Sequence, residues 1–117
     1  MSKPDLIDKT GASVTVVQEQ DRFLALVRDD PAAESYFIDR GGQRVFFHTE
    51  TLEGFEGRGV ASLLVSEALR RTIADRLRIV PVCRLVAGYL DKHPELQPEA
   101  DEPTDELLEW LGEQLSD

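Results

Sequence analysis

The sequence has very few of the residues that cross-link small domains or hold metal ions. Its 117 residues include one cysteine, Cys83, and two histidines, His48 and His93. A single cysteine cannot form a disulfide within the chain, and one thiol with two imidazoles falls short of the four ligands of a structural zinc site. We therefore expect neither an internal disulfide nor a metal centre.

Long apolar runs are also missing. No stretch approaches the ~20 apolar residues that a helix needs to span a bilayer. Residues 1–5 lack the apolar core of a signal peptide. We therefore expect a cytoplasmic protein without a membrane partner. The 41% content of hydrophobic residues is enough for one globular domain with a buried core.

Positive charge is scarce beside negative charge. The chain has 13 lysines and arginines against 23 acidic residues, a formal net charge of -10. A phosphate backbone would repel such a chain, so we expect no nucleic-acid partner. A cationic partner or an amine substrate would be attracted. The same charge also has a simpler interpretation, which is solubility.

β-Branched and aromatic runs separated by turn residues predict four strands in the first half of the chain. They cover residues 13–19, 23–28, 34–39 and 44–52, and residues 1–11 are predicted to be a loose terminus. The short turns, including Gly41-Gly42, favour an antiparallel meander. Strict alternation in the fourth run would separate two sets of side chains. One face would carry Val45, Phe47, Thr49 and Thr51, and the other Phe46, His48, Glu50 and Leu52.

The apolar period changes to helical spacing at residues 60–77. A short fifth strand follows at 78–82, with Pro81 at an end or edge, and a second helix covers 84–92. Residues 95–103 form an acidic linker with two prolines. Thr104 then caps an amphipathic helix that reaches about residue 115, with Leu107, Leu108, Leu111 and Leu115 as its apolar stripe. These elements predict an α+β fold with a mixed sheet of about five strands and two packing helices.

A turn with three glycines, residues 54–59, joins the fourth strand to the first long helix. This order places free backbone N–H groups and the positive end of a helix dipole at one point, which suits a phosphate group. The same residues also suit a tight turn without a ligand. The turn lacks the Gly-Lys-Ser/Thr of a nucleoside triphosphate loop and the glycine spacing of a dinucleotide site.

A series of motifs gives this turn a family resemblance. Glu56-Gly57-Arg58-Gly59-Val60-Ala61 is similar to the (Gln/Arg)-x-x-Gly-x-(Gly/Ala) acetyl-CoA loop of the GNAT superfamily of N-acetyltransferases. The flanking motifs follow the order seen in a small single-domain branch of that superfamily. They are His48-Thr49-Glu50, Val80-Pro81-Val82-Cys83, Tyr89 and His93-Pro94-Glu95.

The resemblance assigns residues 12–96 to a GNAT-like domain and leaves 97–117 as an acidic linker and a C-terminal helix. The chain departs from the branch at Arg84-Leu85, where Pro-Phe is usual, and at Leu96, where tyrosine is usual.

The resemblance implies acetyl-CoA as the cofactor, with pantetheine lying between splayed fourth and fifth strands. Pantetheine would be lined by Thr49, Glu50, Thr51 and Leu52. The pyrophosphate would be held by Glu56, Gly57, Arg58, Gly59, Val60 and Ala61. Arg58 would add a mobile positive charge, and Glu56 would point away from the anion or cap the helix.

Four residues are candidates for the chemistry. His48 could act as the general base and Glu50 could raise its basicity, or both could be ordinary strand residues. Cys83 could accept the acetyl group at the start of a helix, or be a small buried hydrophobe. Tyr89 could protonate the leaving thiolate, or be a core aromatic.

Three functions follow from these patterns. The first is an N-acetyltransferase that acts on a small-molecule or protein amine. The second is a non-catalytic module that binds CoA or acyl-CoA. The third is an interaction domain that uses the 107–115 stripe and Trp110, which includes a possible homodimer.

Overall fold

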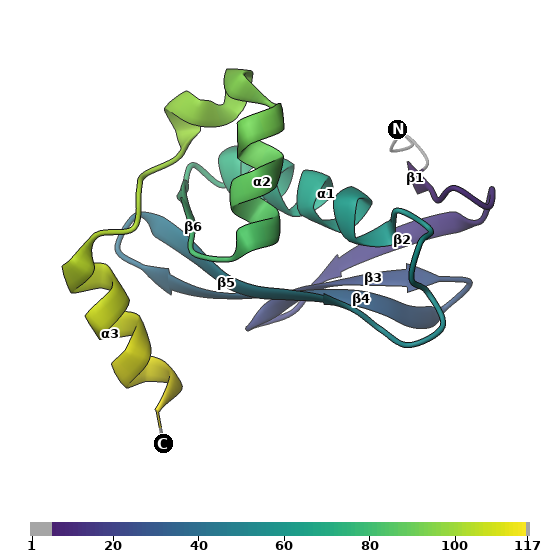
Figure 1. Ribbon diagram of the computed structural model, residues 1–117, viewed down its shortest axis with the longest axis horizontal. Helices are drawn as coiled ribbons and strands as arrows, with labels where there is room; N and C mark the ends of the chain where they lie inside the picture. The colour runs from purple at the N-terminus through teal and green to yellow at the C-terminus, as the bar shows by residue number, and fades with distance from the viewer. Residues whose placement is uncertain (1–5, 117) are drawn as a thin grey trace.

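The chain builds one sheet from six strands that lie side by side in sequence order (Figure 1). The computed structural model describes residues 6–116. The strands are β1 (Leu6–Ile7), β2 (Ser13–Gln18), β3 (Arg22–Val27), β4 (Asp30–Arg40), β5 (Gln43–Thr51) and β6 (Arg78–Pro81). Neighbouring strands from β1 to β5 are antiparallel, and β6 is parallel to β5. The parallel pair arises because a helix crosses over between them.

Three α-helices and one 3₁₀ segment complete the fold. They are α1 (Val60–Ala74), α2 (Arg84–Lys92), η1 (Pro94–Glu99) and α3 (Asp105–Leu115). α1 and α2 lie on one face of the sheet, and α3 lies against the other near the start of β5 (Figure 1). The α+β prediction with a mixed sheet is confirmed, with six strands in place of five.

Several predicted boundaries shift for local reasons. Leu6 and Ile7 pair with β2, so the predicted loose terminus supplies a strand. The β3–β4 turn lies at Arg28 and Asp29, which both have positive φ, and β4 therefore begins at Asp30. α1 ends at Ala74, three residues before the predicted end. The acidic linker is partly ordered, because η1 fills its first half and the N–H of Asp101 donates to the carbonyl of Ile79.

A β-bulge in β5 changes which side chains share a face. Tyr36 lies opposite His48 while Phe37 lies opposite Phe46, so Phe47 is an extra residue. Phe46 and Thr49 consequently face α1 and α2, whereas Phe47 and His48 both pack beside the ring of Tyr36 on the other face. The strict alternation predicted for this strand holds through Phe47 and is wrong from His48 onward.

Two hydrophobic clusters hold the layers together. The larger one lies between the sheet and α1 and α2, and it buries aromatic side chains of β3, β4 and β5. The smaller one lies under α3 and consists of Val45, Val80, Leu107 and Leu111. Thr104 caps α3 as predicted, because its hydroxyl accepts a hydrogen bond from the N–H of Leu107.

A buried carboxylate fixes α1 on the sheet. Glu67 accepts hydrogen bonds from Arg70 at 2.6 Å and from Arg71 at 2.8 Å, and Arg71 also donates to the carbonyl of Val16 in β2 at 2.8 Å. The hydrogen bonds from Arg70 and then Arg71 lower the pKa of Glu67 from 4.5 to about 2, against the opposing effect of burial.

We predict that Glu67 makes stability fall in acid. Its folded-state pKa is below the unfolded value, so its contribution is complete above about pH 4.5 and is lost as the pH falls toward 2. Glu67→Gln should lower Tm at pH 7 by about 5–10 °C and flatten the fall of Tm between pH 5 and pH 2. Thermal unfolding followed by circular dichroism measures both, with the exposed Asp91→Asn as the control. An unchanged acid slope in Glu67→Gln would contradict this assignment.

Candidate functional site

The parallel ladder between β5 and β6 is shorter than β5 itself. It runs from the pair Gln43 and Arg78 to the pair Phe46 and Pro81, and β5 continues to Thr51. After Pro81 the chain turns away into α2, while the N–H of Cys83 still donates to the carbonyl of Phe46. The second half of β5 therefore has an open edge on the side of β6.

The register with β4 shows which backbone groups point to this open edge. The N–H of Leu52 donates to the carbonyl of Ala32, which makes Glu50 a hydrogen-bonded partner of Glu34. Thr49 and Thr51 alternate with these residues, so their N–H and C=O groups point to the open edge. Leu52 does not offer its backbone to this edge, because its N–H donates to Ala32 in β4 and its carbonyl accepts from the N–H of Phe55.

The glycine turn continues from the open edge to the start of α1. Gly57 and Gly59 both have a φ of +77°, a left-handed conformation that suits glycine. Gly59 is the residue before α1 and brings no side-chain cap, and the first turn of α1 has no acidic residue. The helical hydrogen bonds begin with the N–H of Leu63 on the carbonyl of Gly59. The N–H groups of Val60, Ala61 and Ser62 therefore have no acceptor within the helix.

Arg58 is anchored and does not reach into the space before the helix. Its Nε donates to Asp8 at 2.9 Å, another nitrogen donates to Thr10 at 3.2 Å, and the guanidinium lies over the ring of Phe55. The predicted mobile charge is therefore a fixed link between the turn and the β1–β2 connection. Glu56 turns back on its own loop, where it accepts from the N–H of Gly54, as one of its two predicted orientations requires.

Asp8 is the buried end of this link. Its side chain is fully buried and accepts hydrogen bonds from the Thr10 hydroxyl, from two backbone N–H groups and from Arg58. These bonds, the Thr10 hydroxyl first, lower the pKa of Asp8 to about 2. The carboxylate is thus held ionised beside Arg58 at neutral pH.

Lys9, unlike Arg58, provides a positive charge beside the turn before α1 that is not engaged by Asp8. Its N–H donates to the carbonyl of Arg58 at 2.9 Å, and its side chain lies along the turn. A Cβ on Gly59 would lie 3.3 Å from Cε of Lys9. Sequence analysis missed Lys9 and Asp8 because they fall in the predicted loose terminus. The Asp8-x-Thr10 pattern, typical of an Asx turn, was the available signal.

The thiol of Cys83 lies at the end of a chain of hydroxyl groups. Cys83 precedes α2 as its N-cap residue and is buried, and its Sγ lies 3.3 Å from Oγ1 of Thr49. Oγ1 of Thr49 lies 2.9 Å from Oγ of Ser35, which is fully buried. If the thiol ionises, Thr49 can reverse its role and donate to the sulfur while accepting from Ser35.

His48 and Glu50 form a pair on the other face of β5. Nε2 of His48 lies 2.8 Å from Oε1 of Glu50, which confirms that the two side chains share a face. Both side chains are about half exposed. Because the bulge turns His48 and Glu50 to the face opposite Cys83, the structure does not combine His48 and Cys83 into a thiol–imidazole pair.

Tyr89 lines a groove of about 310 Å³ between α1 and α2. Ser62 in the first turn of α1 and Gly88 in α2 also line it, with Arg84 and Lys92 as its charged residues. A Cβ on Gly88 would meet nothing within 4 Å, so the glycine leaves open space there. The ring of Tyr89 stacks on that of His93 at 3.9 Å between centroids, which makes it partly a packing residue.

Residues 6–116 contain no group of three or more histidine, cysteine or acidic side chains that could hold a metal ion. None of the helices that the structure describes is long and apolar enough to cross a membrane.

Comparison with known proteins identifies the family. A family model described as GCN5-related N-acetyl-transferase matches residues 22–98, which is well over half of the chain. The chain belongs to this acetyltransferase family. No curated protein matches the sequence. The match to this GNAT family includes β5, the glycine turn, α1 and α2, and it excludes β1, β2 and α3.

Membership of the GNAT family directs attention to the open edge of β5, where part of the predicted cofactor site lies. The residues expected at the cofactor gather in two places, the edge itself with Thr49 and Thr51, and the turn with Gly57, Gly59 and the start of α1. Cys83 and Tyr89 lie on the helix side of this edge. His48 and Glu50 lie on the opposite side.

We predict that Thr49 controls the reactivity of the Cys83 thiol. Thr49→Val keeps the shape of the side chain and removes the hydroxyl that can donate to a thiolate. A hydrogen bond to a charged group contributes about 1.5–3 kcal/mol, so alkylation of Cys83 by iodoacetamide at pH 7.5 should slow by about tenfold. Mass spectrometry measures the rate. Thr51→Val, on the same face two residues on, is the control, and equal rates in the two variants would refute the role.

Proposed function

We propose that this chain is an acetyl-CoA-dependent N-acetyltransferase that transfers the acetyl group to an amine. The observation that carries the proposal is the open edge of β5, which leads directly to the free N–H groups of α1 in a chain of this family. Such an edge offers peptide groups to the amide groups of pantetheine, and the helix start offers N–H donors to a pyrophosphate.

The residues present fit acetyl-CoA as the acetyl donor. Thr49 and Thr51 would bond pantetheine through their backbone groups. Gly57, Gly59 and the first turn of α1 would hold the pyrophosphate, with Lys9 as the nearby cation. The groove between α1 and α2 provides adjoining space, and Gly88 keeps it open. Arg58 would position this turn through Asp8 and would not itself be a phosphate ligand.

Direct transfer is the route that we propose. An amine that approaches from the open face of the sheet meets His48, which would take its proton, and Glu50 would stabilise the imidazolium that forms. The amine nitrogen then bonds to the acetyl carbon, and the CoA sulfur leaves as a thiolate. Cys83 and Tyr89 lie on the helix side, where either side chain could donate a hydrogen bond to that thiolate.

Two alternatives remain as hypotheses. In a covalent route, the Cys83 thiolate takes the acetyl group as a thioester, and the amine then receives it and releases the thiolate. The Ser35–Thr49–Cys83 chain favours this route, because it can support a thiolate. A non-catalytic module would keep the cofactor site and show no turnover.

We further propose a cytoplasmic location for the protein. The acceptor amine would be cationic at neutral pH, which suits the net charge of -10.

We predict that Lys9 contributes to CoA binding through the phosphates. Lys9→Ala should weaken CoA binding about five- to tenfold, because a lysine and a phosphate at an exposed site attract by about 1 kcal/mol. Titration calorimetry with CoA measures the change. Arg76→Asn, which removes one positive charge just after α1, is the matched control, because the 15-residue helix places it about 22 Å from the glycine turn.

A second ligand and a second variant separate the parts of this prediction. Pantetheine lacks the nucleotide and its phosphates, so Lys9→Ala should not change its affinity. Gly88→Leu would fill the groove and should abolish the thermal shift that CoA causes. No binding of CoA by the wild-type chain at millimolar concentration would reject the cofactor assignment. Equal CoA affinity in wild type and Lys9→Ala would reject only the role of Lys9.

We also predict which candidate residue carries the chemistry. Release of CoA thiol is measured with a panel of polyamines, amino acids and lysine peptides. Direct transfer predicts that His48→Gln lowers kcat by about 10²–10⁴ and that Cys83→Ala changes it only a few fold. A covalent route predicts instead that Cys83 gains the mass of one acetyl group without an acceptor and that Cys83→Ala is inactive. CoA binding without turnover on any amine would favour the non-catalytic module.

A further inference from the structure

α3 carries two apolar surfaces, and its own domain covers only one of them. Leu107 and Leu111 are buried in the smaller cluster. Leu108 and Leu115 are 43% and 52% exposed, which splits the single leucine stripe predicted from the sequence. The two exposed leucines are seven residues apart, so they lie about 20° apart around the helix and two turns apart along it. They form a continuous exposed stripe beside the buried one.

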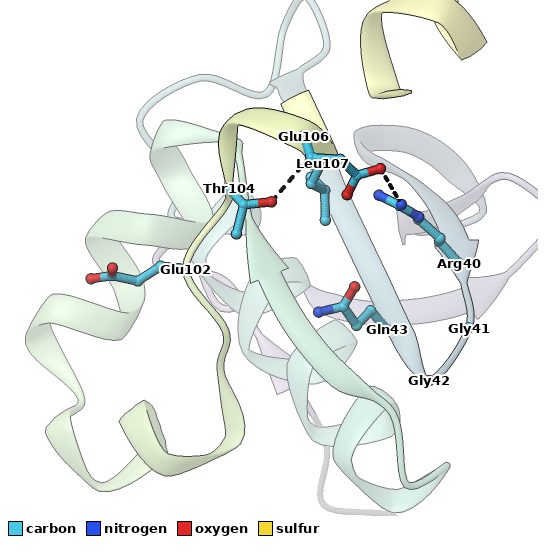
Figure 2. A pocket seen from close by; sticks show the side chains of 8 residues that line it. All are labelled: Arg40, Gly41, Gly42, Gln43, Glu102, Thr104, Glu106 and Leu107. Carbon is cyan, nitrogen blue, oxygen red and sulfur yellow. Dashed lines mark hydrogen bonds and ion pairs between the residues drawn. The ribbon is translucent and has the colours of Figure 1, made fainter. Parts of the chain in front are cut away.

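The position of α3 is fixed, so this stripe has a defined direction. Arg40, beside the β4–β5 hairpin, pairs with Glu106, and its guanidinium lies over the ring of Trp110 at 4.8 Å. Figure 2 shows the Arg40–Glu106 ion pair and the hydrogen bond to the Thr104 hydroxyl on either side of Leu107, at the start of the helix. With Leu107 and Leu111 held against the sheet, Leu108 and Leu115 cannot turn inward without breaking these contacts.

Gly112 makes a notch in the exposed stripe between Leu108 and Leu115. It lies inside α3, where glycine is a poor helix former. The fold does not require it, because its φ is not positive and an added Cβ would meet nothing within 4 Å. Leu108 and Leu115 lie about 10 Å apart along the helix axis, so an apolar side chain from outside can lie against the bare backbone at Gly112 between them.

The charge around the stripe indicates what kind of molecule would cover it. The 13 lysines and arginines of the chain all precede residue 93, whereas 9 of its 23 acidic residues follow Lys92. The part before residue 93 is thus nearly neutral, and the C-terminal part holds almost all of the net charge of -10. On α3, Asp105 and Glu109 follow the exposed stripe on the side away from the sheet, and both are exposed. A second copy of the chain would bring the same negative charge to this surface.

We infer that the outer surface of α3, defined by Leu108, Gly112 and Leu115 with Asp105 and Glu109 beside them, docks a basic amphipathic segment of a partner protein. An apolar side chain of the partner enters the notch at Gly112, and its lysines or arginines face the acidic rim. This inference does not depend on acetyl transfer, because α3 lies outside the residues that match the family.

The test uses the full chain and a fluorescent amphipathic helix of leucine and lysine as the probe. Fluorescence anisotropy compares it with a Gly/Ser/Lys peptide of equal charge and with a leucine and glutamate helix. We expect the leucine and lysine helix to bind at least about tenfold more tightly than the other two, and to weaken as salt rises from 0.05 to 0.5 M. Equal affinity for the leucine and lysine helix and the Gly/Ser/Lys peptide would overturn the inference, since charge alone would explain it.

Variants of the chain locate the binding surface. Leu108→Ser with Leu115→Ser keeps every charge and should lose about tenfold or more in affinity for the leucine and lysine helix. Ile7→Ser, at an apolar residue of β1 that is 54% exposed, is the control and should bind as the wild type does. Gly112→Ala should raise Tm and weaken binding, two effects of opposite sign that a merely structural role would not produce. Unchanged binding in the double variant would overturn the inference.

One further measurement distinguishes the occupant. Sedimentation of the wild-type chain at physiological salt should show a monomer. A dimer that disappears in the Leu108→Ser, Leu115→Ser variant would assign the surface to a second copy and overturn the basic partner.

Discussion

β5 has one residue more than β4 at Phe47, and this extra residue decides which side chains lie on each face of the sheet beside the open edge. Without the bulge, Thr49 would share a face with Phe47 and would point away from Cys83. With it, the Thr49 hydroxyl reaches the thiol, and His48 is directed to the opposite face, next to Tyr36. The edge therefore has different chemistry on its two sides, hydroxyl and thiol groups toward the helices and an imidazole–carboxylate pair toward the open face.

The glycine turn depends on a second constraint, the buried carboxylate of Asp8. A turn with glycines at positive φ has little to hold it in place, and the Asp8–Arg58 link ties it to the β1–β2 connection. Because that link engages the only cation within the turn, a phosphate at the helix start would depend on a different residue for positive charge. Lys9 is held at that point by the same connection, through its N–H on the carbonyl of Arg58.

The parts of the fold that could be predicted are those in which a local pattern decides the structure. The helical spacing of α1, the cap at Thr104 and the meander of β2 to β5 are of this kind. The phase of β5 could not be predicted, because the bulge depends on how Tyr36 and Phe37 pair across the sheet. The partner of Arg58 lies fifty residues away at Asp8. Of the four leucines on α3, the sequence could not show that the sheet is wide enough to cover only Leu107 and Leu111.

The distribution of charge separates the molecule into two parts with different electrostatic roles. Near the glycine turn, Lys9 and the dipole of α1 favour an anion, and the groove beside it contains Arg84 and Lys92. The segment after Lys92 has no lysine or arginine and favours cations. At physiological ionic strength, charges further apart than about 8 Å are largely screened from each other. The acidic C-terminal segment can therefore attract a basic partner or a cationic acceptor without repelling a phosphate-bearing ligand at the start of α1.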